Sequence, residues 1–241
     1  MNAAAMRWRV SETRRIEYEL CNVADVFDPA SDVLLADGRI AGGRRFVVVD
    51  EVVLAHHGAR LAAYFAHHGI DARIVALPGG ERGKTMEAWQ GLLRTLDEFP
   101  IHRRDEPILA IGGGVLTDVV GFAASSYRRG VPHIKVPTTL MGYVDAAVGI
   151  KNGINFNGRK NRLGSFEPPR RVLLDRRLLR TLPPRHLRNG VCEIVKLAVI
   201  KDAALFILLE RHGAASIAGA FQGEAGGAIL DRAIDDMLQE L

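Results

Sequence analysis

The sequence lacks the features that mark secreted, membrane-spanning or disulfide-rich proteins. Its 241 residues include only two cysteines, Cys21 and Cys192, which form neither a CxxC pair nor a disulfide framework. No uncharged apolar run approaches the roughly 18 residues that a membrane span needs. The N-terminus, MNAAAMRWRV, reaches charged residues before an apolar segment develops, which predicts that no secretory signal is present. We therefore expect a cytoplasmic protein with no membrane partner.

Two further classes of binding site have little support. The sequence has no HExxH motif and no Cys/His cluster with metal-ligand spacing. It also has no basic helix and no aromatic platform for bases, so we expect no nucleic-acid partner. The net charge of +4 leaves two interpretations open: a solvated, arginine-rich surface, or a preference for anionic small molecules such as phosphates.

What the sequence does contain is an alternation of apolar strands and helical patterns. Strands are predicted at residues 45–51, 72–77, 107–111, 134–136 and 172–175. This alternation predicts an α/β fold with a Rossmann-like, mostly parallel sheet. After Pro183-Pro184 only helices are predicted, at residues 189–201, 203–211 and 228–241. We predict one α/β domain over residues 1–182 and the start of an all-α domain over residues 183–241.

Two glycine-rich loops follow predicted strands. Gly112-Gly113-Gly114 lies between a strand and a helix, and Pro78-Gly79-Gly80 is followed by Glu81 and Lys84. Glycines at a helix N-terminus let the backbone approach an anion, but this triplet is not a GxGxxG fingerprint, and a plain tight turn would look the same. Because open α/β sheets bind ligands at the carboxyl ends of neighbouring strands, we expect a ligand site there.

Residues 137–164, PTTLMGYVDAAVGIKNGINFNGRKNRLG, mix cations and amides with apolar residues and glycines. A solvated loop would not need the apolar residues, and a buried core would not tolerate unpaired lysines. The mixture predicts a partly buried polar pocket.

The helix predicted at residues 189–201 is apolar nearly all round, which predicts a buried helix. Glu193 and Lys196 lie on one of its faces at i and i+3. Two interpretations stay open: an internal ion pair, or a carboxylate ligand or base beside a phosphate-binding lysine.

Taken together, these segments resemble the dehydroquinate synthase superfamily, the sugar phosphate cyclases. The resemblance covers about residues 45–241 and rests, in order, on PGGERGKT, GGGVLTDVVGFAASSYRRGV, PTTLMGYVDAAVGIKNGINFNGRKNRLGSF and TLPPRHLRNGVCEIVKLAVIKD. Within the superfamily, Gly149-Ile150-Lys151-Asn152 resembles 2-epi-5-epi-valiolone synthases more than dehydroquinate synthases, which typically show a GGKTAVN-type segment. His186 also stands where dehydroquinate synthases usually carry Glu.

The resemblance implies a cyclisation that depends on NAD+ and a divalent metal, zinc or cobalt. The implied reaction converts sedoheptulose 7-phosphate to 2-epi-5-epi-valiolone by oxidation, β-elimination of phosphate, re-reduction and aldol closure. A 3-dehydroquinate synthase is the alternative enzyme, and a catalytically inactive NAD-binding fragment is the alternative of another class. The resemblance also implies a homodimer for the full-length protein, with a sugar phosphate as its small-molecule partner.

Site residues follow from the resemblance position by position. Asp145, Lys151 and Lys196 match catalytic positions. Substrate-binding positions are matched by Arg129, Lys151, Asn161 and Lys196, whose cations suit a leaving phosphate. Nucleotide-contacting positions are matched by Asp50, Glu51, Glu81, Lys84, Gly113, Gly114, Asp118, Thr138, Thr139, Asp145 and Lys160. Residues 1–182 are accordingly expected to bind NAD+.

Glu193 matches a metal-binding carboxylate, but the superfamily's other two metal ligands are histidines downstream. No histidine follows His212 here, and a catalytic zinc normally has three protein ligands. We therefore expect that the C-terminal part of the protein is missing, that the metal site is incomplete, and that this chain alone is inactive.

Overall fold

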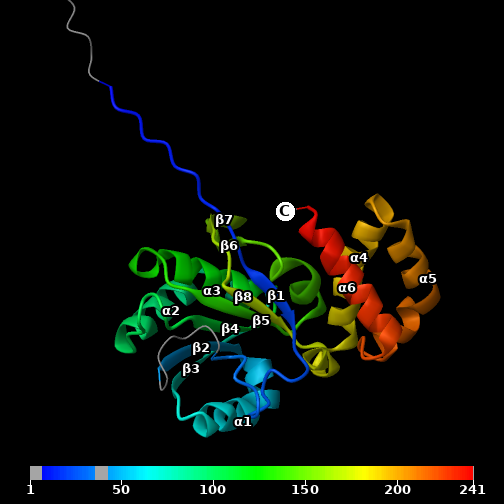
Figure 1. Cartoon of the computed structure of the whole chain (residues 1–241), viewed down its shortest axis with the longest axis horizontal. Coiled ribbons are helices and arrows are strands. Elements are labelled where there is room, and N and C mark those ends of the chain that lie inside the picture. The colour runs from blue at the N-terminus through cyan, green and yellow to red at the C-terminus, as the bar shows by residue number, and fades with distance from the viewer. Residues whose placement is uncertain (1–6, 36–42, 241) are drawn as a thin grey trace, which may run out of the picture.

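The computed structural model describes residues 7–35 and 43–240, and its centre is a six-stranded sheet (Figure 1). The strand order is β1-β8-β5-β4-β2-β3, and every ladder within this sheet is parallel. The strands are β1 (Glu19–Asn22), β2 (Arg44–Asp50), β3 (Asp71–Leu77), β4 (Ile108–Gly112), β5 (His133–Pro137) and β8 (Arg171–Leu174). The predicted α/β class is confirmed, and β1, which the sequence analysis did not predict, forms one edge.

Helices cover both faces of this sheet because its central strands are apolar on both sides. In β2, Val47 and Val49 face a core shared with the first helix, whereas Phe46 and Val48 face a core shared with the next two. Alternate residues of one strand thus serve two cores, which explains its continuous apolar run. The helices are α1 (Glu51–His67) on one face, and α2 (Met86–Glu98) and α3 (Gly114–Ser126) on the other.

The strand order contains a topological switch point beside β2. Because β2 lies between β3 and β4, the chain crosses to one side of β2 first and then to the other. Asp50 ends β2 and Gly112 ends β4, so both residues flank the crevice where open parallel sheets bind ligands.

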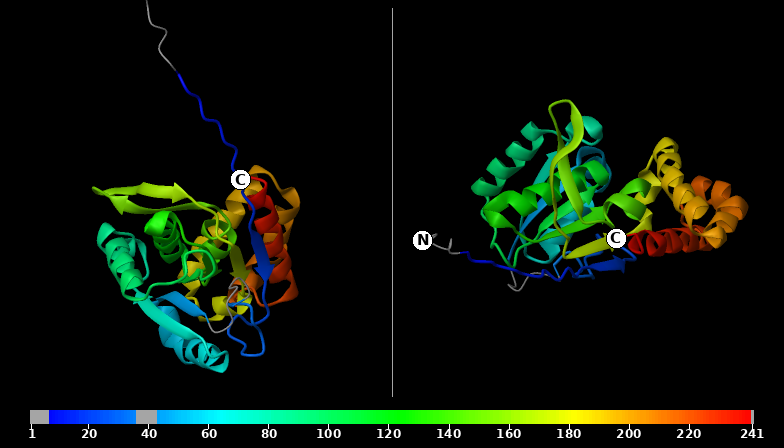
Figure 2. Two further views of the ribbon diagram at one scale, coloured as in Figure 1. Left: turned by 60° about the vertical axis from the view of Figure 1, so that its left-hand side comes forward. Right: turned by 90° about the horizontal axis from the view of Figure 1, so that it is seen from above.

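A two-stranded antiparallel hairpin, β6 (Lys151–Phe156) and β7 (Arg159–Phe166), projects from the body of the molecule (Figure 2). Its turn residues Asn157 and Gly158 have φ angles of 49° and 70°, as a tight two-residue hairpin turn requires. The sequence predicts a pocket here but no hairpin, because β7 is mostly exposed and lacks an apolar alternation. The Asn-Gly pair is the signal that could have revealed the hairpin.

Three helices follow the sheet and pack beside it: α4 (Pro184–Ile200), α5 (Ala203–Ala218) and α6 (Glu224–Leu238) (Figure 2). Their core is continuous with Tyr143, Val144 and Leu174 of the α/β part. The division at residue 182 stays a prediction, since this core contains residues from both sides. Within the described ranges, no helix is long and apolar enough to cross a membrane.

The expectation that the helix carrying Glu193 is buried all round is wrong. Ile194 and Leu197 of α4 are buried, but Val199 and Ile200 are 66% and 72% exposed. In this chain α5 and α6 cover one side of α4, so its apolar residues on the other side face solvent.

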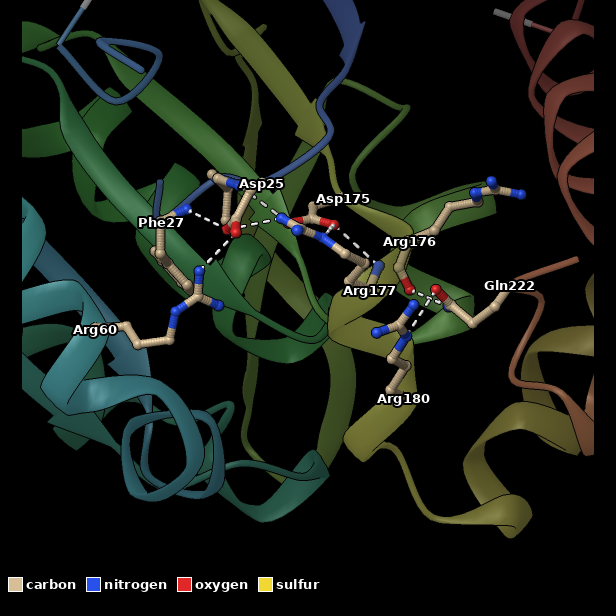
Figure 3. Close-up of polar contacts among 9 residues, drawn as sticks. Asp25, Phe27, Arg60, Asp175, Arg176, Arg177, Arg180 and Gln222 are labelled. Atoms are coloured by element: carbon tan, nitrogen blue, oxygen red, sulfur yellow. Dashed lines mark hydrogen bonds and ion pairs between the residues drawn. The ribbon is translucent and has the colours of Figure 1, made fainter. Parts of the chain in front are cut away.

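An ion-pair and hydrogen-bond network attaches the helices to the sheet (Figure 3). The guanidinium of Arg177 lies 2.7 Å from a carboxylate oxygen of Asp25 and 3.2 Å from one of Asp175. Arg60 of α1 donates to Asp25 at 2.7 Å. Beyond this, Arg180 donates to Gln222, between α5 and α6, at 3.0 Å. The network therefore connects the segment after β1, α1, the chain after β8 and the helical part.

Candidate functional site

The first part of the candidate site lies at the carboxyl ends of β2 and β3. Asp50 caps α1 by accepting a hydrogen bond from the amide of Val52 at 2.9 Å. A Cβ atom added to Gly79 would lie 2.3 Å from Asp50 Oδ2, so only glycine lets this loop approach the carboxylate so closely. Glu51 follows as the first, exposed residue of α1. The loop after β3 is thus held against the end of β2, as the glycine pattern indicated.

The glycine triplet after β4 forms the second part. Gly113 is the N-cap residue of α3 and provides no side-chain cap, so the first amides of this helix have no side-chain acceptor at that position. A Cβ on Gly113 would lie 2.9 Å from Thr139 Cγ2, and a Cβ on Gly114 would lie 2.9 Å from Ala146 Cβ. The backbone here is therefore packed closely between neighbouring segments, while the helix N-terminus can receive an anion. Thr138 continues this edge by donating its amide to the carbonyl of Gly112 at 3.0 Å.

Lys84 and Asp118 form an ion pair beneath this edge. Lys84 Nζ lies 2.5 Å from Asp118 Oδ2, and the two side chains are only 7% and 18% exposed. Burial raises the pKa of Asp118, although the charge and hydrogen bond of Lys84 act against that shift. The pair joins the loop after β3 to the first turns of α3.

The hairpin contacts the same edge. The side-chain nitrogen Nδ2 of Asn155 in β6 donates to Glu81 Oε1 at 2.9 Å, and its backbone N–H donates to the carbonyl oxygen of Lys84 at 2.9 Å. The hydrogen bond from Asn155, together with the nearby charge of Lys160, holds the pKa of Glu81 below its usual value despite partial burial. The backbone N–H of Asn161 donates to Asn155 Oδ1 at 2.9 Å. Asn155, which the sequence analysis assigned no role, therefore links the hairpin to the nucleotide-site candidates.

A cavity of about 770 Å³ opens beside the α3 N-terminus, between the hairpin and the helical part. It brings together five of the candidate site residues from α3, the π-helix Gly142–Ala146, the hairpin and α4. These five residues are Asp118, Asp145, Lys151, Asn161 and Lys196. The cavity also has lining residues that sequence reasoning missed: Ser165, Lys201, Met237 and Glu240. The last three come from the ends of α4 and α6, which only the tertiary fold brings to this place.

Asp145 is the carboxylate best suited to proton transfer in this cavity. Burial raises its pKa, and the negative charge of nearby Glu193 raises it further, while Lys196 and Lys151 act in the opposite direction. A carboxyl group in such surroundings can hold and release a proton closer to neutral pH than an exposed one.

Glu193 and Lys196 form an ion pair on α4. The hydrogen bond from Lys196 to Glu193 raises the pKa of Lys196. Lys196 is about half exposed and Glu193 is largely buried, so the lysine faces the cavity mouth. Of the residues in the described ranges, no group of three or more His, Cys, Asp and Glu side chains is placed to hold a metal ion. Glu193 therefore has no complete ligand set here.

Arg129 lies apart from the other candidate residues. It comes just before β5, with a φ of 64°, and lines a second cavity together with Arg103 and Arg104. This cavity is at the amino ends of β4 and β5. The candidate nucleotide edge, formed by Asp50, Gly79 and the triplet Gly112-Gly113-Gly114, lies at the carboxyl ends of the strands, as does the cavity with Asp145. Within one chain, Arg129 does not join them.

Comparisons with known proteins agree with this geometry. Residues 74–189 match the family described as 3-dehydroquinate synthase N-terminal. Over 242 aligned residues, the chain is 48% identical to a 2-epi-5-epi-valiolone synthase from Actinoplanes sp. (strain ATCC 31044 / CBS 674.73 / SE50/110), covering 97% of this chain. The chain belongs to the dehydroquinate synthase superfamily.

Solved structures share the architecture of this chain. ValA, a 2-epi-5-epi-valiolone synthase from Streptomyces hygroscopicus subsp. jinggangensis 5008 with NAD+ and Zn2+ bound, superposes with a TM-score of 0.90 at 42% identity, covering 97% of this chain. A 2-deoxy-scyllo-inosose synthase complexed with carbaglucose-6-phosphate, NAD+ and Co2+ superposes with a TM-score of 0.66 at 30% identity, covering 75% of this chain.

This superfamily member spans only part of the proteins that it matches. It covers 61% of the Actinoplanes synthase, 64% of ValA and 48% of the 2-deoxy-scyllo-inosose synthase. The alignment with ValA nevertheless includes nearly all of this chain, and therefore both the nucleotide edge and the cavity.

Proposed function

We propose that this chain is the NAD+-binding part, with most of the substrate pocket, of a sugar phosphate cyclase that converts sedoheptulose 7-phosphate to 2-epi-5-epi-valiolone. The observation that carries the proposal is the cavity that brings Asp145, Lys151 and Lys196 together with Asp118 of α3, the helix that follows the glycine triplet. Its mixture of cations, amides and two carboxylates with raised pKa values, Asp118 and Asp145, suits a phosphorylated polyol. The relationship to 2-epi-5-epi-valiolone synthases supports the choice of substrate.

The residues at the sheet edge fit a dinucleotide. The closely packed backbone at Gly113 and Gly114 exposes the α3 N-terminus to a pyrophosphate, and Asp50 at the end of β2 offers a carboxylate to a ribose hydroxyl. Thr138 and Thr139 line the neighbouring strand end. When bound, NAD+ supplies a reversible hydride acceptor for a substrate hydroxyl.

The cavity residues have separate roles in phosphate binding, substrate orientation and proton transfer. Lys151 and Lys196 bind the phosphate and stabilise it as it leaves, because ammonium groups match its developing charge. Asn161 orients substrate hydroxyl groups by hydrogen bonding. Asp145 accepts a proton from the substrate hydroxyl or the adjacent carbon and returns it later, as its burial favours.

A metal ion does not fit the described residues. Glu193, the metal ligand that the resemblance implies, is paired with Lys196. The described residues contain no group of three or more His, Cys, Asp and Glu side chains that could hold a metal ion, and a catalytic zinc needs about three protein ligands. We therefore propose that the 241-residue chain alone binds NAD+ but retains little metal and has negligible turnover. A homodimer and a cytoplasmic location are proposed for the complete enzyme on the basis of the superfamily relationship.

The experiment compares the 241-residue chain with the complete reading frame of its gene. Each is incubated with NAD+, Co2+ or Zn2+ and sedoheptulose 7-phosphate, and phosphate release and cyclitol formation are measured. The complete protein is expected to release phosphate and form the cyclitol, whereas the 241-residue chain only binds NAD+. Absence of both products with the complete protein would refute the cyclase assignment. Stoichiometric metal and phosphate release with the short chain would refute its proposed inactivity.

A 3-dehydroquinate synthase is the second candidate, favoured by the family description that matches residues 74–189. Against it, Asn152 and His186 stand where the resemblance expects Thr and Glu. Phosphate release from the dehydroquinate precursor, with none from sedoheptulose 7-phosphate, would select this candidate.

A further inference from the structure

Strand β5 carries two buried ionisable side chains that the proposed mechanism does not use. His133 is 1% exposed and Lys135 is 0% exposed, and both lie on the face of the sheet that α3 covers. Neither ring nitrogen of His133 has a hydrogen-bond partner among the described residues. Lys135 differs, because its ammonium group contacts the segment that leads into the substrate cavity.

Lys135 Nζ donates to the carbonyl oxygen of Gly149 at 3.1 Å and to that of Ala146 at 3.4 Å. These two carbonyls lie between Asp145 and Lys151, so one ammonium group holds the short connection between the two cavity residues. A lysine in a strand of the central sheet is a fixed support, since β5 is hydrogen-bonded on both sides to β4 and β8.

Two further carbonyls of this connection also accept hydrogen bonds from donors outside it. The hydroxyl of Tyr18 donates to the carbonyl of Val148 at 2.6 Å. The amide of Glu167 donates to the carbonyl of Ile150 at 2.9 Å. Residues 147–150 belong to no strand or helix, and groups on β5, in the N-terminal segment and just after β7 hold the carbonyls of the connection in place.

The same connection reaches the nucleotide edge. Ala146 is the residue whose methyl group packs against Gly114 at the α3 N-terminus. Asp118 on α3 also faces Lys135 and, by its charge, favours the protonated amine, whereas burial lowers the pKa of Lys135 to about 8. At neutral pH the side chain is still an ammonium group, so its hydrogen bonds are charge-assisted.

We propose that Lys135 is a positioning residue that fixes the connection between Asp145 and Lys151. It thereby determines where these two side chains lie in the cavity and how closely Ala146 packs against Gly114 at the α3 N-terminus. Its effect on ligand binding rests on the proposed function, but its effect on the connection does not. Lys135 touches neither ligand in this role, since it acts through two backbone carbonyls.

The test compares Lys135→Met with His133→Leu in the 241-residue chain. Both variants replace a buried polar side chain on the same face of β5 with an apolar one, but only the first removes the bonds to residues 146 and 149. Amide hydrogen exchange is measured without ligand. We expect Lys135→Met to speed exchange in residues 145–151 by at least about tenfold, and His133→Leu to leave it within about twofold of the wild type.

The second readout is NAD+ affinity, measured by calorimetry. We expect Lys135→Met to raise the Kd by about five- to tenfold and Lys135→Gln, which keeps one amide donor, to recover part of the loss. Lys135→Gln also takes the place of Lys135→Met in the exchange experiment if the latter does not fold.

Two results would overturn the proposal: unchanged exchange in residues 145–151 in the Lys135 variant, or equal acceleration in His133→Leu. Failure of the wild-type chain to bind NAD+ would refute the proposed function instead, while the exchange comparison would still decide the role of Lys135.

Discussion

Backbone groups form one part of the candidate site, whereas charged side chains form the other. At the nucleotide edge, backbone dominates: glycines pack within van der Waals distance of neighbouring segments and a helix N-terminus provides the donors. In the cavity beside it, long charged side chains such as Lys151 and Lys196 dominate, and they come from segments far apart in the sequence. The edge should therefore be intolerant of added atoms, whereas the cavity should be tolerant of them but sensitive to lost charge.

The largest change in the free energy of unfolding is expected at the buried Lys84–Asp118 ion pair, where the candidate nucleotide edge depends on charge. Lys84→Met leaves the buried carboxylate of Asp118 without its partner, so we expect a loss of about 3–5 kcal/mol in the free energy of unfolding, measured by urea denaturation. The double variant Lys84→Met/Asp118→Leu removes both charges and should be clearly more stable than Lys84→Met. A loss below about 1 kcal/mol in the single variant would mean that the pair is not effectively buried.

The next effect tests how closely the edge is packed. Gly114→Ala brings a methyl group within 2.9 Å of Ala146 Cβ, which cannot rotate away, so the backbone must shift. We expect NAD+ binding to weaken by about 2–3 kcal/mol, roughly 30- to 150-fold, as measured by calorimetry.

Gly91→Ala is the matched control for Gly114→Ala. Gly91 lies within α2 with nothing near an added Cβ. Here NAD+ affinity should not change, and stability should rise by about 0.5–1 kcal/mol, because alanine favours the helix. Equal NAD+ affinity for the wild type and Gly114→Ala would show that the edge is less tightly packed than its geometry indicates.

A smaller effect concerns the boundary between the two parts, where Lys135 lies. Its pKa is lowered from 10.5 to about 8 by burial, with the charge of Asp118 acting in the opposite direction. Between these two values the unfolded chain binds the proton and the folded chain does not, so stability rises with pH. Relative to Lys135→Met, the wild type should gain on the order of 1–2 kcal/mol between pH 8 and 10.5 in urea denaturation. A flat difference across this range would contradict the buried position of the amine.

The smallest effect is expected on the exposed side of the hairpin. Lys160 Nζ lies 3.6 Å from Glu81, and both side chains are well exposed. Lys160→Ala should change the free energy of unfolding by less than about 0.5 kcal/mol, since surface ion pairs contribute little. A loss comparable to that of Lys84→Met would remove the distinction between buried and surface charge at this edge.

Local patterns in the sequence are sufficient to predict five of the six strands of the sheet and its glycine loops. The five predicted strands correspond to β2, β3, β4, β5 and β8, because each is a short apolar run followed by glycine, proline or acidic residues. The strand β1 escapes prediction because its four residues are only partly buried and carry no such pattern. The hairpin escapes it because β7 is polar, although the Asn157-Gly158 turn was visible.

The cavity required information that no local pattern contains. Lys201, Met237 and Glu240 reach it only because α4 and α6 pack together beside the sheet. Arg129 shows the opposite case. The family resemblance implied a place among the substrate-binding cations, but in this chain Arg129 lies at the amino ends of the strands, away from the cavity with Asp145. Lys135 went unnoticed because a single lysine in an apolar strand gives no indication of what its ammonium group contacts.

Strand β1 also has a consequence for the order in which the protein assembles. It pairs in parallel with β8, joining Leu20 to Val172, so these partners are about 150 residues apart in the chain. On the ribosome, β1 emerges early and must wait until β8 has been synthesised before its edge of the sheet can form. The central strands can pair before then. The N-terminal segment that contains Tyr18, and with it one contact to the connection between Asp145 and Lys151, is therefore placed among the last steps of folding.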